Sequence, residues 1–133
     1  MKTILTAGVF DLLHFGHVEL FRRAKALGDR LVVAVQEDRS ILKYKPEAKT
    51  VYSTEERRYL VAAIRYVDEA ITYDDVDRLV QETGFDVFVM GGDQTHAGFQ
   101  RAETWCREHG KETVRLARTE GISTSALKQS LKD

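Results

Sequence analysis

Short apolar runs alternate with longer amphipathic stretches along the whole chain, and this alternation limits the possible folds more than any other feature. The β-branched and aliphatic runs that we expect to be strands cover residues 3–9, 30–35, 68–72, 86–90 and 112–116. The stretches with helical periodicity cover residues 18–27, 53–65, 76–83 and 99–109. Strands that alternate with helices pair in parallel through right-handed crossovers. We therefore predict an α/β fold, a mainly parallel five-stranded sheet with helices on both faces.

Composition excludes several classes of protein. The chain has 133 residues, which is the size of one domain, so we expect residues 1–133 to form a single domain. Its 20 basic and 21 acidic side chains give a net charge of -1, which argues against nucleic acid as a partner. The one cysteine, Cys106, excludes an internal disulfide. No apolar run approaches the roughly 20 residues that span a bilayer, and no signal peptide precedes the first strand, so we expect no membrane partner and a cytoplasmic location.

The segments that follow the strands are the first place to look for a ligand site. Ligands of open parallel sheets bind beyond the carboxyl ends of the strands, where the strand order reverses. The segment 39–51 follows the second strand, is rich in lysine and contains the only proline, so we expect it to be a loop. Its lysines are candidates for binding phosphate.

The clearest motif is His14-Phe15-Gly16-His17, which lies between the first strand and the first helix. Two imidazoles three positions apart can face one ligand, and a helix N-terminus favours an anion. Gly16 has no side chain, so a phosphate can approach the backbone closely. The other interpretations are two histidines with only local hydrogen bonds, or an i, i+3 metal pair that lacks a convincing third ligand.

A second motif precedes the C-terminal end of the chain, at Arg118-Thr119-Glu120-Gly121-Ile122-Ser123-Thr124. Gly121 frees the backbone, the hydroxyls can bind an anion, and Arg118 adds a permanent positive charge. Taken alone, this pattern is more typical of the N-terminus of an ordinary capped helix. Neither a GxGxxG nor a GxxxxGK[ST] pattern is present, which argues against a dinucleotide oxidoreductase and a P-loop kinase.

Together, the segments GVFDLLHFGH (8–17) and RTEGIST (118–124) resemble the motifs of the cytidylyltransferase family of nucleotidyltransferases. The resemblance covers nearly the whole chain and is strongest to the bacterial glycerol-3-phosphate cytidylyltransferases. It implies a Rossmann-like domain that transfers CMP from CTP to a small phosphate monoester, such as glycerol 3-phosphate, and releases pyrophosphate. The product would be a CDP-activated precursor for a cell-surface polymer or lipid. The resemblance also implies Mg²⁺ as cofactor, with CTP as co-substrate, and a homodimer.

The same resemblance implies roles for individual residues. The catalytic residues are expected to be His14, His17, Lys45 and Arg118. Nucleotide binding is expected at Val9, Phe10, Asp11, Gly16, Arg65, Gly91, Asp93, Arg118, Gly121, Ile122, Ser123 and Thr124. Binding of the acceptor is expected at Lys43, Lys45, Arg57, Gln94 and His96, with Lys45 as the first choice among the loop lysines.

Two segments depart from the family pattern, and both are expected to contact the acceptor. The family's tryptophan ahead of the third helix is missing, and this chain has Tyr73-Asp74-Asp75-Val76 there. The glycerol-3-phosphate enzymes read MGDDW after the fourth strand, whereas this chain has Gly92 and Gln94 in place of the first aspartate and the tryptophan. We therefore expect an acceptor pocket that is roomier and less acidic, suited to a larger phosphate or one with its own carboxylate. The Gly91-Gly92-Asp93 sequence after the fourth strand also resembles that of heptose-phosphate adenylyltransferases. The alternatives are thus an adenylyltransferase acting on a sugar phosphate or FMN, and a non-catalytic nucleotide sensor.

Overall fold

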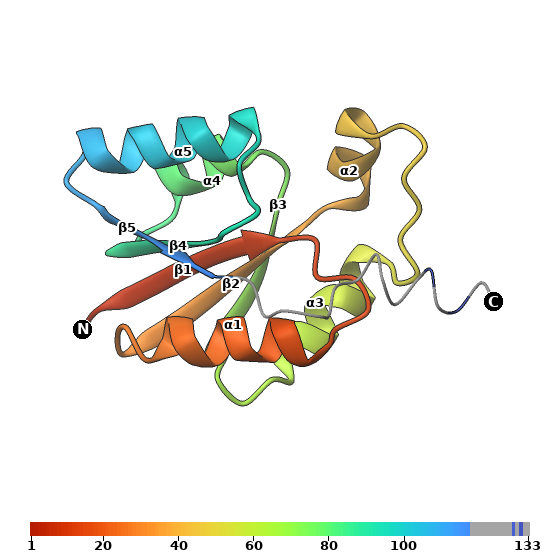
Figure 1. The fold of residues 1–133 in the computed structure, drawn as a ribbon, viewed down its shortest axis with the longest axis horizontal. Coiled ribbons are helices and arrows are strands. Elements are labelled where there is room, and N and C mark those ends of the chain that lie inside the picture. Colours follow the sequence, from red (N-terminus) through yellow and green to blue (C-terminus); the bar gives the residue numbers. More distant parts are fainter. Residues whose placement is uncertain (118–128, 130, 132–133) are drawn as a thin grey trace.

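The computed structural model describes residues 1–117, 129 and 131, and its centre is a five-stranded parallel sheet (Figure 1). The strands are β1 (Thr3–Gly8), β2 (Arg30–Gln36), β3 (Glu69–Tyr73), β4 (Val87–Gly91) and β5 (Glu112–Leu116). The helices are α1 (Phe15–Lys25), α2 (Asp38–Tyr44), α3 (Thr54–Ala62), α4 (Val76–Glu82) and α5 (Ala97–Glu108). The α/β class and the five parallel strands predicted from the alternating pattern are confirmed.

Two apolar layers cover the two faces of the sheet. Helices α1 and α3 lie on one face, where Phe21 and Val61 are fully buried, and α4 and α5 lie on the other (Figure 1). On that second face Val80 and Ala102 are fully buried against Phe88 of β4. Burial on both sides explains why the central strands are continuous apolar runs rather than alternating ones. No helix in the described part of the chain is long and apolar enough to cross a membrane.

The strand order, β3-β2-β1-β4-β5, reverses between β1 and β4. Ile4 of β1 pairs with Leu31 of β2 on one side and with Val87 of β4 on the other. Strands β2 and β3 thus lie on one side of β1, and the chain then crosses to the other side of β1 to form β4 and β5. Loops diverge at such a point and leave a crevice at the carboxyl ends of the strands.

Several predicted boundaries differ from the structure, and two of these differences have an evident physical cause. The first helix begins at Phe15 rather than at residue 18, because His14 serves as its N-cap, a position that sequence rules assign to other residue types. The segment 39–51 is not entirely a loop, because α2 occupies its first part. This short helix depends on tertiary contacts that no local pattern reveals: Arg39 binds Asp74 through two hydrogen bonds of 2.9 and 2.8 Å, and the Ser40 hydroxyl donates to the Asp74 carbonyl.

Candidate active site

A cavity of about 1030 Å³ opens at the carboxyl edge of the sheet, at the point where the strand order reverses. The loops that follow β1, β2, β3 and β4 all contribute to its wall. Many of the residues expected at the site from the sequence line it, namely Val9, Phe10, Asp11, His14, Gly16, His17, Lys45, Gly91, Asp93, Gln94 and His96. Ala117, the last residue of the continuously described part of the chain, also lines the cavity. The other expected site residues lie outside the described residues, namely Arg118, Gly121, Ile122, Ser123 and Thr124.

His14 and His17 form the N-terminal cap of α1. The Nδ1 atom of His14 accepts the Gly16 backbone N–H at 3.0 Å, and the Nδ1 atom of His17 accepts the His14 backbone N–H at 3.3 Å. This reciprocal arrangement is a capping box made by two imidazoles instead of the usual hydroxyl and carboxylate. The two rings stack with their centroids 3.8 Å apart. Local hydrogen bonding and a role in the cavity therefore coexist in the same pair of side chains.

The capping bonds determine which ring nitrogen carries the proton. A neutral imidazole has one donor and one acceptor nitrogen, and in both rings Nδ1 is the acceptor. The proton of each neutral ring is thus assigned to Nε2, which is a hydrogen-bond donor. Burial, followed by the charge of His14, lowers the pKa of His17 to about 4, while Asp93 opposes the shift. His17 is therefore a neutral N–H donor at pH 7.

This lowered pKa predicts a pH-dependent loss of stability. Unfolded His17 takes up a proton near its ordinary pKa of 6.5, whereas folded His17 does so only near 4, so acid favours the unfolded state in that window. We expect wild type to lose roughly 2–3 kcal/mol of unfolding free energy relative to His17→Asn between about pH 7 and 4. Urea unfolding of both proteins across this range measures the difference. Parallel stability curves would contradict the prediction.

Asp11 connects two of the loops around the cavity. Its buried carboxylate accepts the backbone N–H groups of Val51 at 2.7 Å and Tyr52 at 3.1 Å. This joins the loop after β1 to the segment that leads into α3. The expectation that Asp11 binds nucleotide stays a prediction, whereas its structural role is evident.

Arg57 does not have the position expected of a phosphate ligand. Its side chain is fully buried, and its Nη1 atom donates to the carbonyls of Val9 at 2.9 Å and Gln36 at 2.8 Å. Its Nη2 atom binds Asp38 at 2.6 Å. The guanidinium thus joins the ends of β1 and β2 to α2, and the cavity wall does not include it. The expected contact with the acceptor is corrected accordingly, because helical position 57 faces the sheet.

Two other expected residues lie away from the cavity. Arg65 is exposed in the turn between α3 and β3, at the edge of the sheet where β3 begins, because α3 carries the chain back from the carboxyl edge. Lys43 projects outward on α2, with its side chain 67% exposed and 4.0 Å from Asp75. Lys45, one residue beyond α2, lines the cavity, as does Lys49. Of the two loop lysines expected to bind the acceptor, Lys45 rather than Lys43 thus lines the cavity.

Gln94 supports the cavity wall through its side-chain amide. Its Oε1 atom accepts the Gly91 N–H at 2.9 Å, and its Nε2 atom donates to the Ala7 carbonyl at 2.8 Å. The amide thereby fastens the loop after β4 to β1. Gln94 lines the cavity, and the expectation that it contacts the acceptor stays a prediction, since its amide has a second N–H and a second lone pair beyond these two bonds.

The part of the cavity that follows β3, referred to below as its far end, is acidic, so the expectation of a less acidic acceptor pocket was wrong. Asp74, Asp75 and Asp77 line it together with Tyr44 and Arg101. The Tyr44 hydroxyl donates to Asp75. Asp74 and Asp75 belong to the segment 73–76, whose departure from the family pattern led us to expect it near the acceptor, and the structure places this segment in the cavity wall.

His96 stands near this far end, at the N-cap of α5. Its ring packs edge-on against Phe99, with the centroids 4.7 Å apart. Partial burial, followed by the positive charges of Lys45 and Arg101, lowers its pKa. His96 and Lys45 thus approach the cavity from opposite loops.

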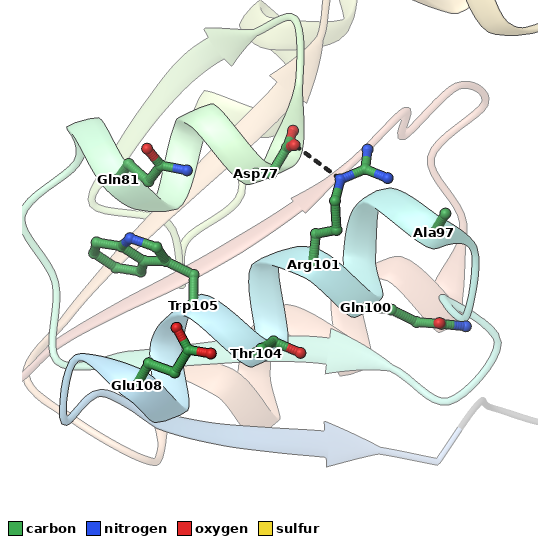
Figure 2. A pocket seen from close by; sticks show the side chains of 8 residues that line it. All are labelled: Asp77, Gln81, Ala97, Gln100, Arg101, Thr104, Trp105 and Glu108. Carbon is green, nitrogen blue, oxygen red and sulfur yellow. Dashed lines mark hydrogen bonds and ion pairs between the residues drawn. The ribbon is translucent and has the colours of Figure 1, made fainter.

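Outside the cavity, a hollow of about 490 Å³ lies along the outer surface of α4 and α5 (Figure 2). Arg101 reaches from α5 across to α4, where its Nε atom donates to Asp77 at 3.0 Å. Both residues line the hollow and the cavity, so this ion pair marks the boundary between them. Trp105 lies at the other end of the hollow and packs partly against the core.

The fold agrees with comparisons to known proteins. A family model described as cytidylyltransferase-like matches residues 5–130. The chain belongs to the cytidylyltransferase-like family. It is 42% identical to a glycerol-3-phosphate cytidylyltransferase from Bacillus subtilis (strain 168) over 98% of both chains. It is also 37% identical to the bifunctional protein HldE of Koribacter versatilis (strain Ellin345), over 95% of this chain but only 26% of that protein.

A solved structure agrees as well. The lipopolysaccharide core biosynthesis protein from Thermoplasma volcanium GSS1 superposes with a TM-score of 0.77 at 27% identity, covering 90% of this chain and 99% of that one. The fold is thus Rossmann-like, as expected. Family membership and the named glycerol-3-phosphate relatives support a CTP-dependent nucleotidyltransferase, so the chain is an enzyme rather than a sensor.

Proposed function

We propose that this enzyme transfers CMP from CTP to a small polyol phosphate, with glycerol 3-phosphate as the first candidate. The observation that carries the proposal is the pair of stacked histidines in the cavity wall at the N-terminus of α1. Likeness over the full length to the Bacillus subtilis enzyme supports the choice of nucleotide and acceptor. The product would be CDP-glycerol or a similar activated precursor for a cell-surface polymer or lipid.

The chemistry requires little proton transfer. An ionised oxygen of the acceptor phosphate attacks the α-phosphorus of CTP, a new P–O bond forms, and the bond to the β-phosphate breaks to release pyrophosphate. The protein must hold two anions in line and offset the negative charge that develops. The Nε2–H donors of His14 and His17, together with the N-terminal end of α1, are suited to that charge.

The acceptor is proposed to bind between Lys45 and the acidic far end of the cavity. Lys45 supplies a positive charge for its phosphate, and Asp75 and Asp77 can accept hydrogen bonds from its hydroxyl groups. A carboxylate on the acceptor would be repelled by these aspartates. We therefore no longer expect an acceptor that carries its own carboxylate, and favour a polyhydroxylated phosphate.

Magnesium is proposed to enter with the nucleotide. Among the described residues no three histidine, cysteine or acidic side chains gather into a metal site. The Nδ1 atoms of His14 and His17 are already bound to backbone N–H groups. These residues do not fit a protein-held ion, whereas Mg²⁺ commonly binds through substrate phosphates and water. A homodimer in the cytoplasm remains part of the proposal.

The test is pyrophosphate release, measured for CTP, ATP, GTP and UTP against a panel of acceptors. The panel contains glycerol 3-phosphate, other polyol phosphates, sugar 1-phosphates and FMN, and the double variant His14→Asn/His17→Asn is the control for contaminating activity. We expect CTP with a polyol phosphate to give the highest kcat/KM. A higher kcat/KM with ATP, for any acceptor, would overturn the choice of nucleotide.

A second candidate is nucleotidyl transfer to a sugar phosphate. The likeness to HldE proteins and to the lipopolysaccharide core biosynthesis protein of Thermoplasma volcanium GSS1 favours it. The same panel separates the two, because a sugar 1-phosphate would then exceed every polyol phosphate.

Lys45 and Lys43 provide a matched pair of variants for the acceptor site. We expect Lys45→Ala to lower kcat/KM for the acceptor roughly 10–100-fold, because a hydrogen bond to a charged group contributes about 1.5–3 kcal/mol. Lys43→Ala removes the same charge from the same helix end, but this ammonium lies outside the cavity and contacts the site through Asp75 at 4.0 Å, so we expect a loss several-fold smaller than that of Lys45→Ala. Steady-state kinetics with the acceptor varied gives both values. Equal losses would indicate a general electrostatic effect.

A further inference from the structure

We propose that Phe10 is a positioning residue that holds the imidazole of His17 in its working orientation. Nothing in the family comparison assigns this role, and the residue was expected only to contact nucleotide. The argument rests on the backbone of residues 10–12, on the contacts of the Phe10 ring, and on the space that Gly8 leaves for it.

The backbone around Phe10 has an uncommon conformation. Phe10 (φ 53°) and Leu12 (φ 47°) are the two residues other than glycine with positive φ in the described part of the chain. Such residues are uncommon, and bulky ones persist where their surroundings enforce the conformation. Here the enforcing contact is Asp11 between them, whose carboxylate is held by two backbone N–H groups. In this conformation the Phe10 side chain packs inward at the cavity wall, and the residue is only 6% exposed.

The ring of Phe10 lies against His17. Their planes are nearly perpendicular, at 87°, with the centroids 5.5 Å apart, and the other partner of the ring is Phe21 of α1, at 5.1 Å. His17 also stacks on His14 and accepts one hydrogen bond through Nδ1. A single hydrogen bond leaves an imidazole free to tilt, whereas aromatic contacts at two sides restrict its plane. His14 supplies one of these two aromatic contacts, and Phe10 supplies the other.

Gly8 makes room for this ring. A Cβ atom at Gly8 would lie 2.9 Å from Cζ of Phe10 and 3.2 Å from both Cε atoms. The backbone of Gly8 has no positive φ, so alanine could adopt its conformation, and the aromatic ring is what an added methyl group would meet. Gly8→Ala therefore acts as a wedge behind Phe10 and provides a second way to displace the ring.

The experiment combines Phe10→Leu, Gly8→Ala and the double variant. Each is characterised by kcat, by KM for CTP, and by the ¹⁵N NMR signals of His17, which distinguish the Nδ1 acceptor from the Nε2–H donor. We expect Phe10→Leu to lower kcat about 10-fold with less than a twofold change in KM for CTP, since small misplacements of catalytic groups cost up to about 10² in rate. The His17 signals should shift or broaden. Gly8→Ala should lower kcat and shift the His17 signals in the same way. The double variant should have about the same kcat as Phe10→Leu, because the added methyl group then has no aromatic ring to displace.

Phe88→Leu is the matched control. Phe88 is fully buried on the opposite face of the sheet and packs on Phe85 and Phe99, so its truncation lowers the melting temperature without touching His17. If Phe10→Leu lowers the melting temperature as Phe88→Leu does but leaves kcat and the His17 signals unchanged, the ring is only core packing and the proposal fails. A rise in KM for CTP at constant kcat would instead indicate direct nucleotide contact and also overturn it. Only the kinetic readout rests on the proposed function, whereas the NMR readout applies even if the nucleotide proves different.

Discussion

His14→Asn and His17→Asn should each lower kcat by about 10²–10³ while KM for CTP changes little. The asparagine Oδ1 atom occupies nearly the place of imidazole Nδ1, so it can still accept the capping N–H that each histidine accepts now. What the variant loses is the Nε2–H donor on the cavity side. A donor that acts on charge present mainly in the transition state typically contributes this much to the rate. Steady-state kinetics with CTP varied, at saturating acceptor, measures the split.

Glutamine and alanine complete the series. Glutamine places an amide N–H near the position of Nε2, so His14→Gln and His17→Gln should retain more activity than the asparagine variants. Alanine loses both the cap and the donor, and should therefore cost about 1 kcal/mol of stability in addition to the rate. Asparagine variants that keep full activity would contradict the assignment of Nε2–H as the working group.

Arg57→Ala should lower the free energy of unfolding by roughly 3–5 kcal/mol, because it leaves Asp38 and the carbonyls of Val9 and Gln36 without their buried partner. Urea unfolding monitored by circular dichroism gives the value. Arg58→Ala is the control from the next position on α3. Its guanidinium pairs with Glu55 at the exposed surface, and exposed pairs contribute about 0–1 kcal/mol.

The two possible roles of Arg57 give different results. If the residue contacts the acceptor phosphate, as the sequence suggested, its removal would raise KM for the acceptor and leave stability nearly unchanged. If Arg57 instead joins the strand ends to α2, its removal lowers the free energy of unfolding. The kcat value then falls as well, because the segment that leads to Lys45 loses its hydrogen bonds to Arg57. Arg57→Lys should be intermediate in stability, since one ammonium group cannot reach every acceptor that the planar guanidinium binds.

Local patterns predicted the elements well where the pattern was long and the cause was local. Residues 87–90 of the predicted strand 86–90 are buried, and such an apolar run is recognisable without knowing its neighbours. Helix α2 was missed for the opposite reason. Its seven residues are too few to show periodicity, and its stability comes from Asp74 and Asp75, which lie more than 30 residues away.

The sequence by itself determined the class of fold, the place of the site and the histidine pair, since these depend on short-range periodicity and on motifs next to strand ends. The tertiary structure decided the direction in which side chains point and what they meet. It placed Arg57 inside and Lys45 in the cavity, bound the amide of Gln94 to the backbone, and brought Asp75 and Asp77 to the far end. It also placed the Phe10 ring against His17. Hydrogen bonds and burial between segments distant in the chain have no signature in local sequence, because the residues that complete them become neighbours only when the sheet has formed.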